Sequence, residues 1–440
     1  MKEKIRIGCG AGFSGDRLEP ALILAQKGEL DYLVLECLAE RTIALAQKRK
    51  LQDNRKGYDI LLERRIHSLL PALKKNKIRL ITNMGAANPI AAANKIIEIA
   101  KELNIEISVA AVTGDDTFDK VDPQQQAVET NEPLSASGKL ISANAYLGVE
   151  AILPALQTSA DVVITGRVAD PSLFLAPMIH EFSWPLNEYD LLGKGTVIGH
   201  LLECAGQVTG GYFADPGKKE VPDISQLGHP FADVFADGSA MISKVAGTGG
   251  IINLQTAKEQ LLYEVVDPYA YYTPDVVADF TTVRLQQTAR DCVRVTGGSG
   301  KEKPSTYKVS VGYHAFYLGE GEISYAGSNA MGRAKLAASI IEERLQDTFP
   351  DLQIDYVGST SVHHTSFQHA SEPYEVRLRV AAKANSFGKA SIIGEEVEAL
   401  YTNGPAGGGG VRKYVNEVIG IVSTLIGKEK VESCVTLFKS

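Results

Sequence analysis

Several features that mark particular classes of protein are scarce or missing in this chain. Its 440 residues include one tryptophan and five cysteines, which are scattered without a C-x-x-C pair. An odd number of cysteines without a framework indicates reduced thiols, so we expect a cytoplasmic protein. No apolar run approaches the ~18 residues that a membrane-spanning helix needs. The first residues pass directly into a strand-like run, without the apolar region of a secretory signal.

Positive charge is also in deficit, with a formal net charge of -8 at pH 7. Proteins that bind nucleic acid present a basic stripe, and anionic membranes attract basic segments. We therefore expect neither a nucleic acid nor a membrane as a partner. The hydrophobic share of 44% and the charged share of 22% are usual for a globular protein. A chain of this length exceeds one typical core, which favours two domains.

The first part of the chain alternates strand-like and helix-like patterns. Five short β-rich runs precede helical patterns or turns, at Ile5–Gly8, Tyr32–Glu36, Ile78–Thr82, Ile107–Val112 and Asp161–Thr165. Such alternation predicts an α/β domain with a mainly parallel sheet, either open and doubly wound or barrel-like. Later runs alternate with a period of two around a helix near 329–349, which predicts a smaller α+β domain. We place the domains at residues 1–272 and 273–440.

Polar residues follow the predicted strands, where α/β proteins collect ligands. The first strand leads into a loop of four glycines, which allow close approach to a ligand. Its spacing, G-x-G-x-G-x-x-G, matches neither the dinucleotide fingerprint nor a P-loop, so we interpret it as an anion or substrate loop. Asp16 and Asp170 would also suit helix N-caps, so each is interpreted either as a cap or as a substrate-binding residue. The predicted substrate-binding residues at these strand ends are Ser14, Asp16, Arg17, Asn83, Arg167 and Asp170. At the end of the fourth strand, Asp116 is a candidate general acid or base.

A second candidate lies in the helical pattern 198–208. His200, Glu203 and Cys204 share one arc of this helix, opposite an apolar arc. The arc is either a solvated face or part of a site, and cysteine is a poor choice for a solvated face. Glu203 would then be a general acid or base, and Cys204 would serve as a nucleophile if His200 or the helix environment lowered its pKa. Only two or three metal ligands are visible in this segment, so we predict no metal site. We interpret His363, His364 and His369 as loop histidines.

A third candidate is a glycine-rich loop late in the chain. Gly407, Gly408 and Gly409 precede Arg412 between a strand-like run and a helical pattern. Cations in the first turn of a helix are unfavourable unless an anion offsets them. The loop therefore fits either a phosphate-bearing ligand or a hinge.

The chain resembles the acyclic terpene utilisation family of bacterial catabolic proteins. The matching segments are GCGAGFSGDR (8–17), DYLVLECLAE (31–40), ITNMGAANP (81–89), VAAVTGDD (109–116), ITGRVADPSLFLAP (164–177), GHLLECAGQVTGGYFADPG (199–217), EQLLYEVVDPYAYYTPDV (259–276) and NGPAGGGG (403–410). The resemblance implies a pathway that runs through branched-chain acyl-CoA thioesters, and it assigns no catalytic role to any residue. Longer members carry a further small domain, so the resemblance also implies a small protein partner.

Together these observations predict a cytoplasmic catabolic enzyme that acts on a carboxylate or a branched acyl-CoA, as a lyase or hydro-lyase without a redox cofactor. Arg17 and Arg167 would hold a carboxylate or phosphate, while Asn83 would stabilise an oxyanion. The alternatives are acyl transfer or hydrolysis through Cys204, and a non-enzymatic accessory subunit that binds a CoA-like effector. We also expect a homo-oligomer, as is common for large α/β enzymes.

Overall fold

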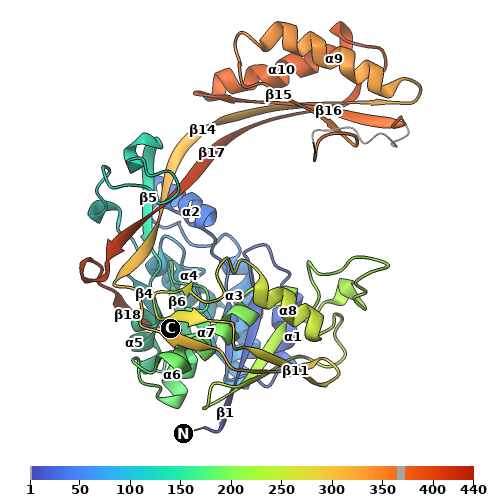
Figure 1. The fold of residues 1–440 in the computed structure, drawn as a ribbon. Coiled ribbons are helices and arrows are strands. Elements are labelled where there is room, and N and C mark those ends of the chain that lie inside the picture. Colours follow the sequence, from blue (N-terminus) through green and yellow to red (C-terminus); the bar gives the residue numbers. More distant parts are fainter. Residues whose placement is uncertain (1, 364–371) are drawn as a thin grey trace. The chain divides into compact units, whose positions relative to one another are not determined.

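The computed structural model describes residues 2–363 and 372–440, and the chain packs as two compact units (Figure 1). Unit 1 consists of Met1–Ala136, Ile141–Gly312 and Ile421–Ser440, and unit 2 consists of Ser137–Leu140 and Tyr313–Gly420. These packing units do not test the predicted domains, residues 1–272 and 273–440, which remain a prediction. The packing units differ from them because two long strands, β14 (Thr306–Ala326) and β17 (Gly409–Gly427), each belong partly to both units.

Unit 1 is built on a mixed ten-stranded sheet whose centre is parallel. The five neighbouring parallel strands are, in spatial order, β1 (Lys4–Ala11), β2 (Tyr32–Leu35), β3 (Arg79–Thr82), β6 (Val162–Thr165) and β4 (Ser108–Thr113). All five arise from the predicted β-rich runs. Because the strand order is linear and ends at two edges, the sheet is open and not a barrel.

Antiparallel strands extend this centre on both sides. Beyond β1 follow β7 (Pro230–Phe235), β8 (Ala240–Lys244), β12 (Cys292–Thr296) and β11 (Arg284–Ala289), and β18 (Cys434–Lys439) pairs with β4. The α/β class is confirmed, but the expectation of a mainly parallel sheet is wrong. The β7–β8 and β11–β12 pairs are hairpins that the sequence analysis overlooked. The pairs β1–β7, β8–β12 and β4–β18 join strands that lie far apart in the sequence. A separate antiparallel sheet contains β13 (Ser299–Lys301), β10 (Val277–Asp279) and β9 (Tyr271–Tyr272).

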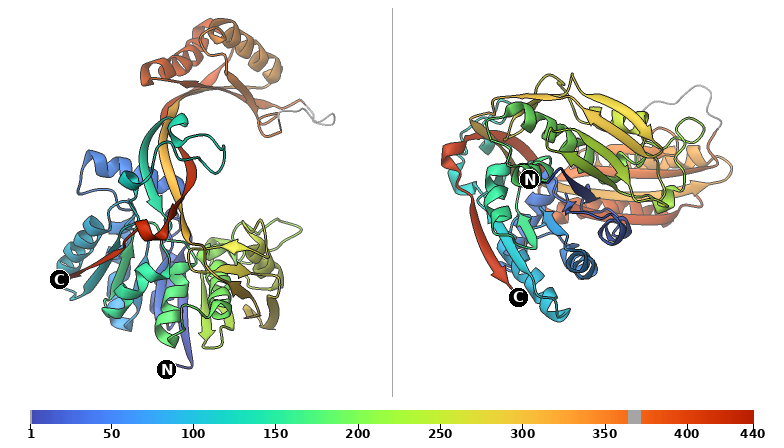
Figure 2. Two further views of the ribbon diagram at one scale, coloured as in Figure 1. Left: turned by 60° about the vertical axis from the view of Figure 1, so that its left-hand side comes forward. Right: turned by 90° about the horizontal axis from the view of Figure 1, so that it is seen from below.

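Helices cover both faces of the parallel centre (Figure 2). One layer contains α1 (Glu19–Lys27), α3 (Leu62–Asn76) and α4 (Pro89–Glu102), and the other contains α5 (Val149–Gln157), α6 (Ser172–Phe182) and α7 (Tyr189–Glu203). The first layer and the sheet enclose a core of Leu, Ile, Val and Ala side chains. Two further helices of unit 1 are α2 (Glu40–Gln52) and α8 (Leu254–Leu262).

At the helix starts, one asparagine caps its helix, whereas the two aspartates with a possible capping role do not. Asn88 caps α4 by accepting a hydrogen bond from the backbone N–H of Ala91, with proline in the first position. Asp16 does not cap α1: its carboxylate accepts from the backbone N–H groups of Gly12 and Phe13, and closes the glycine loop on itself. Asp170 does not cap α6, because its side chain pairs with Arg167.

Unit 2 contains a sheet ordered β15 (Gln353–Val357), β16 (Glu375–Ala384), β14 and β17, and β5 (Lys139–Ala145) also pairs with β14. The helices α9 (Ala330–Leu345) and α10 (Phe387–Asn403) share an apolar core with this sheet. The glycine loop here links α10 to β17, so the predicted strand-loop-helix context is wrong. Arg412 lies on a strand and not in a helical first turn, which removes the dipole argument for an anion.

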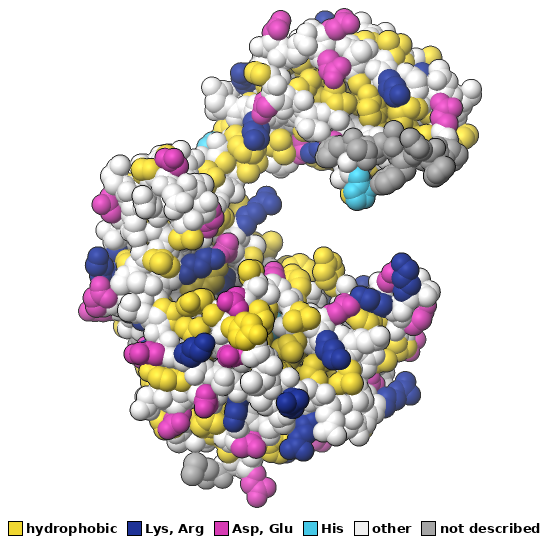
Figure 3. All heavy atoms as spheres, viewed as in Figure 1, with side chains coloured by type: hydrophobic (Ala, Val, Ile, Leu, Met, Phe, Trp, Pro, Cys, Tyr) yellow, Lys and Arg dark blue, Asp and Glu magenta, His cyan; other side chains and the backbone are white. Residues whose placement is uncertain are grey.

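The helices described for this chain include none that is both long and apolar enough to cross a membrane. On the face shown in Figure 3, hydrophobic side chains are interspersed with charged side chains of both signs.

Candidate functional site

A buried polar cluster lies where the parallel strands of unit 1 end. Glu36 follows β2 and Asn83 follows β3, and both side chains are buried. Asn83 Nδ2 donates to Glu36 Oε1 at 2.8 Å, and Asn83 Oδ1 accepts from the Cys37 backbone N–H at 2.7 Å. The Leu38 backbone N–H donates to the same Glu36 oxygen at 2.9 Å. Asn83 therefore fixes the position of a buried carboxyl group.

Glu36 is held in a state that resists ionisation. Burial raises the pKa of Glu36 well above its ordinary value, and the neighbouring carboxylate of Asp170 raises it further. Attraction by Arg167 and the hydrogen bond from Asn83 act in the opposite direction without reversing the shift. A carboxyl group of this kind can serve as a proton donor near neutral pH.

Arg167 follows β6, brings a positive charge to this cluster and is almost fully buried. Its guanidinium donates to the backbone carbonyl of Leu38 and to Asp170 Oδ1, the latter at 2.5 Å. It also lies 4.0 Å from the centre of the Tyr146 ring, a cation–π arrangement. Its Nε atom is buried and has no hydrogen-bond partner. The side chain of Asp170 is 36% exposed, so this pair reaches solvent at one end.

The Asp115 carboxylate fixes the backbone of Arg167. The Arg167 backbone N–H and Asn144 Nδ2 both donate to Asp115 Oδ2, each at 2.9 Å. Burial raises the pKa of Asp115 to about 6. Gly166 is required beside it, because a Cβ there would lie 2.3 Å from Asp115 Oδ1.

The predicted candidate Asp116 points elsewhere. Its side chain is 41% exposed, with Gln47 Nε2 at 3.4 Å and Lys50 Nζ at 3.6 Å. Adjacent residues on an extended chain point to opposite sides, so Asp115 and Asp116 have different environments. Asp116 therefore does not lie with Arg167, and its position does not support the predicted acid/base role.

Tyr146 connects the cluster to β14. Its hydroxyl donates to Glu40 Oε1 at 2.7 Å, and Lys308 Nζ donates to the same oxygen at 2.8 Å. The Tyr146 backbone N–H donates to the Lys308 carbonyl at 2.9 Å. These contacts fix the ring against which Arg167 packs.

The end of α7 supplies a second buried pair. His200 and Glu203 lie one turn apart, with His200 Nδ1 at 2.7 Å from Glu203 Oε1. The imidazole ring lies 5.4 Å from the ring centres of both Tyr271 and Phe280. His200 Nε2 and Glu203 Oε2 are buried without a hydrogen-bond partner. Both side chains are buried, so neither lies on a solvated face.

Glu203 joins the two pairs electrostatically. Burial raises the pKa of Glu203 to about 7, His200 opposes the shift, and the carboxylates of Asp170 and Glu264 increase it. Asp170 and Glu203 also both raise the pKa of Tyr271 above its ordinary value, after burial. The His200–Glu203 pair and the Arg167–Asp170 pair therefore interact electrostatically, through the carboxyl groups of Glu203 and Asp170.

Cys204 differs from its predicted placement. Helix α7 ends at Glu203, so Cys204 is the capping residue and not part of a helical arc. Its side chain is half-buried, and burial raises the pKa of its thiol, with a further contribution from Glu203. A raised thiol pKa lowers the thiolate fraction that a nucleophile requires.

The first glycine loop packs against this helix end. A Cβ at Gly12 would lie 2.4 Å from the Cys204 carbonyl carbon, so only glycine permits the contact. Backbone carbonyls of Ser14 and Asp16 accept hydrogen bonds from the buried Arg65. Arg17 is exposed and donates to the Ser225 carbonyl at 2.9 Å, so it does not join Asn83 and Arg167.

The remaining candidates have other surroundings. Gly407, Gly408, Gly409 and Arg412 belong to unit 2, where a Cβ at Gly407 would lie 2.9 Å from the Arg333 guanidinium. His364 and His369 lie outside the described residues. Within residues 2–363 and 372–440, no group of three or more His, Cys, Asp or Glu side chains could hold a metal ion.

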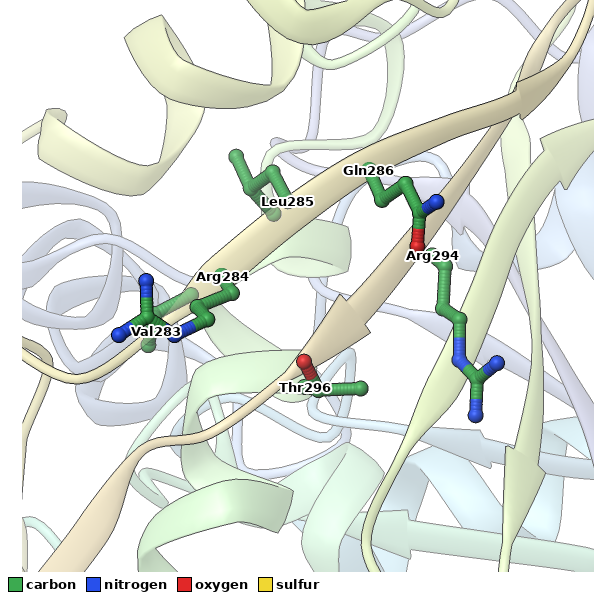
Figure 4. A pocket seen from close by; sticks show the side chains of 6 residues that line it. All are labelled: Val283, Arg284, Leu285, Gln286, Arg294 and Thr296. Carbon is green, nitrogen blue, oxygen red and sulfur yellow. The ribbon is translucent and has the colours of Figure 1, made fainter.

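A cavity of about 490 Å³ lies on the β11–β12 hairpin, lined by Val283, Arg284, Leu285, Gln286, Arg294 and Thr296 (Figure 4). This lining contains no carboxyl, imidazole or thiol group. It therefore offers no acid/base chemistry and is not the candidate site.

Sequence reasoning missed Glu36, Asp115, Tyr146 and Tyr271 as members of the site. Glu36 and Asp115 also stand at strand ends, and a count of strand-end carboxyls would have included them. No sequence signal pointed to Tyr146 or Tyr271, because their placement depends on segments distant from the strand ends.

The arrangement is suited to moving protons. Arg167 supplies a buried positive charge with one unsatisfied N–H, and the carboxyl groups of Glu36, Asp170 and Glu203 have raised pKa values.

No curated protein and no solved structure matches the chain significantly. Residues 5–437 match the family model described as acyclic terpene utilisation family protein AtuA. Since this match covers nearly the whole sequence, the chain belongs to the acyclic terpene utilisation family.

Proposed function

We propose that this protein is a cytoplasmic enzyme of acyclic terpene utilisation that acts on a carboxylate or branched acyl-CoA substrate, as a lyase or hydro-lyase. The observation that carries the proposal is the buried contact of 2.7 Å between His200 Nδ1 and Glu203 Oε1. Burial raises the pKa of Glu203 to about 7, and the carboxylate of Asp170 contributes to this shift. A group with a pKa near the operating pH both accepts and returns protons efficiently.

In this proposal Arg167 holds the anionic or carbonyl end of the substrate through its planar guanidinium. The Glu203–His200 pair removes a proton from the carbon next to the carbonyl group. Glu36, held neutral by burial, donates a proton to the departing hydroxyl, which leaves as water as the carbon–carbon double bond forms. Asn83 positions Glu36 and does not need to contact substrate.

The rival nucleophilic function of Cys204 has less support. Burial raises the pKa of the thiol, whereas a cysteine nucleophile needs a lowered pKa. A second rival is an accessory subunit that binds a CoA-like effector without turnover. The unpartnered His200 Nε2 and Glu203 Oε2 atoms favour an enzyme, because a purely structural pair would satisfy these buried atoms.

The test is a screen of purified protein in deuterated water with branched acyl-CoA thioesters and 3-hydroxy acids. Proton NMR then follows exchange at the carbon next to the carbonyl and the gain or loss of water. We expect turnover by the wild type and by Cys204→Ser. Glu203→Gln should lose about 100-fold or more in kcat, the usual scale for an acid/base residue.

Asp116→Asn is the matched control, because Asp116 is a carboxylate near the same strand ends but lies apart from Arg167. It should retain activity. Loss of activity in Cys204→Ser with retention in Glu203→Gln would overturn the proposal in favour of the nucleophilic rival. Absence of both exchange and turnover across the panel would favour the accessory subunit.

A further inference from the structure

A second cavity lies on unit 1 and shares no residue with the buried cluster. It has a volume of about 780 Å³ and lies between the connection from α2 to α3 and the outer face of α4. Its volume falls within the ~300–1,000 Å³ typical of small-molecule sites. We call it the α4 groove; its lining includes Lys56, Tyr58, Ile90, Asn94, Ile97 and Lys101.

The walls of the α4 groove are fixed by hydrogen bonds. Asn88 Nδ2 donates to the backbone carbonyls of Asn54 and Lys56, each at 2.8 Å, while Asn88 Oδ1 caps α4. The Ala87 backbone N–H donates to the Gly57 carbonyl at 2.9 Å. Gly57 adopts a φ of +101°, which an L side chain rarely takes. The connection is therefore held against α4, and the groove is formed before any ligand arrives.

The charge of the α4 groove is opposite in sign to that of the whole chain. Four cationic and two acidic side chains line it, in a protein whose net charge is -8. Both acids are already neutralised, since Asp53 pairs with Arg55 at 3.2 Å and Glu98 pairs with Lys95 at 2.5 Å. In the part of the chain that the structure describes, Lys56 and Lys101 form no ion pair. Two positive charges are thus left for a ligand.

The remaining lining suits an organic body attached to the anion. Ile90 is half-buried and supplies apolar surface, whereas Ile97 belongs to the core beneath it. The exposed amide of Asn94 supplies a donor and an acceptor. An inorganic anion alone would leave this apolar surface in contact with water. We propose that the α4 groove binds an organic phosphate of nucleotide size, with Lys56 and Lys101 as its phosphate contacts.

The experiment is isothermal titration of the full chain with AMP, adenosine and inorganic phosphate. We expect AMP to bind, and we expect adenosine and phosphate each to bind at least about tenfold more weakly than AMP. The affinity for AMP should decrease as the salt concentration rises. The double variant Lys56→Gln/Lys101→Gln should lose about tenfold in affinity for AMP. Glu98→Gln releases Lys95 and should tighten binding about threefold.

The matched control is Lys27→Gln/Lys75→Gln, which removes two exposed lysines that do not line the groove. It should bind AMP as the wild type does. The proposal is overturned if AMP does not bind at millimolar concentration, if adenosine binds as tightly as AMP, or if both double variants lose affinity equally. Binding is measured without turnover, so the result is independent of the proposed enzyme activity.

Discussion

His200 Nδ1 lies 2.7 Å from Glu203 Oε1, one turn away on α7, and both side chains are buried. Burial raises the pKa of Glu203 to about 7 from an ordinary value of 4.5. The folded protein therefore retains a proton that the unfolded chain releases between pH 4.5 and pH 7. The free energy of unfolding should decrease as pH rises through this window, and this contribution should be constant above it.

The variant Glu203→Gln removes this titration. Its unfolding free energy should fall less between pH 5 and pH 7 than that of the wild type, by on the order of 2 kcal/mol. Urea unfolding followed by circular dichroism at several pH values measures the difference. Glu19→Gln, an exposed carboxyl change at the start of α1, is the control and should reproduce the wild-type curve. Parallel curves for Glu203→Gln and wild type would contradict the prediction.

Asn83→Ala should destabilise unit 1. The change leaves the Glu36 carboxyl and the Cys37 N–H without their buried partner, which costs about 1–3 kcal/mol. Urea unfolding at pH 7 gives the value directly. Asn187→Ala, at an exposed asparagine, should change stability by less than about 0.5 kcal/mol. Equal stability of the two variants would show that Asn83 does not hold Glu36.

The sequence was sufficient to predict the parallel strands and the strand-end position of Asn83 and Arg167. Their β-rich runs are separated by amphipathic helices, and this pattern is local. The antiparallel half of the sheet was not predictable in this way, because β18 pairs with β4 across more than 300 positions of sequence. A strand pattern in the sequence does not identify the strand with which it pairs.

The site was predicted in part, for the same reason. Strand ends are local, so Asn83, Arg167 and Asp170 were found. The choice between Asp115 and Asp116 depends on which side of the chain faces Arg167, and composition does not give this. Arg17 was expected beside Arg167, but the glycine loop closes through Asp16 and turns Arg17 towards Ser225.

The adjacent carboxylates Asp115 and Asp116 should respond differently to the same change. Asp115→Ala removes the acceptor of the Arg167 and Asn144 donors and should cost about 1–3 kcal/mol at pH 7. Asp116→Ala should stay within about 0.5 kcal/mol of the wild type. Because the pKa of Asp115 is raised to about 6, its ionisation should lower stability as pH rises from 3.8 to 6. Thermal unfolding of both variants at pH 5 and pH 7 checks these values, and a larger loss in Asp116→Ala would contradict them.

We expect the protein to form a homo-oligomer, with residues 273–440 at or near an interface and a small protein as a further partner. Tyr374 and Phe387 are 78% and 60% exposed, and β11 is an edge strand of the large sheet. Exposed apolar side chains and free strand edges favour association. Sedimentation velocity at micromolar concentration should show a species larger than one chain. The double variant Tyr374→Ser/Phe387→Ser should shift the distribution towards the monomer, and a monomeric wild type would contradict the expectation.

The thiol of Cys204 should react slowly in the native protein. Burial raises its pKa, so the thiolate that attacks an alkylating reagent is rare at neutral pH. Cys434 is exposed on β18 and serves as an internal reference within the same chain. With iodoacetamide at pH 7.5, peptide mass spectrometry should find Cys434 labelled at least ~tenfold faster than Cys204. Cys434→Ser should abolish the fast phase, whereas Cys204→Ser should leave it intact. Labelling of Cys204 at the rate of Cys434 would show an activated thiol, and the nucleophilic function would then replace acid/base chemistry by Glu203 as the better account of the site.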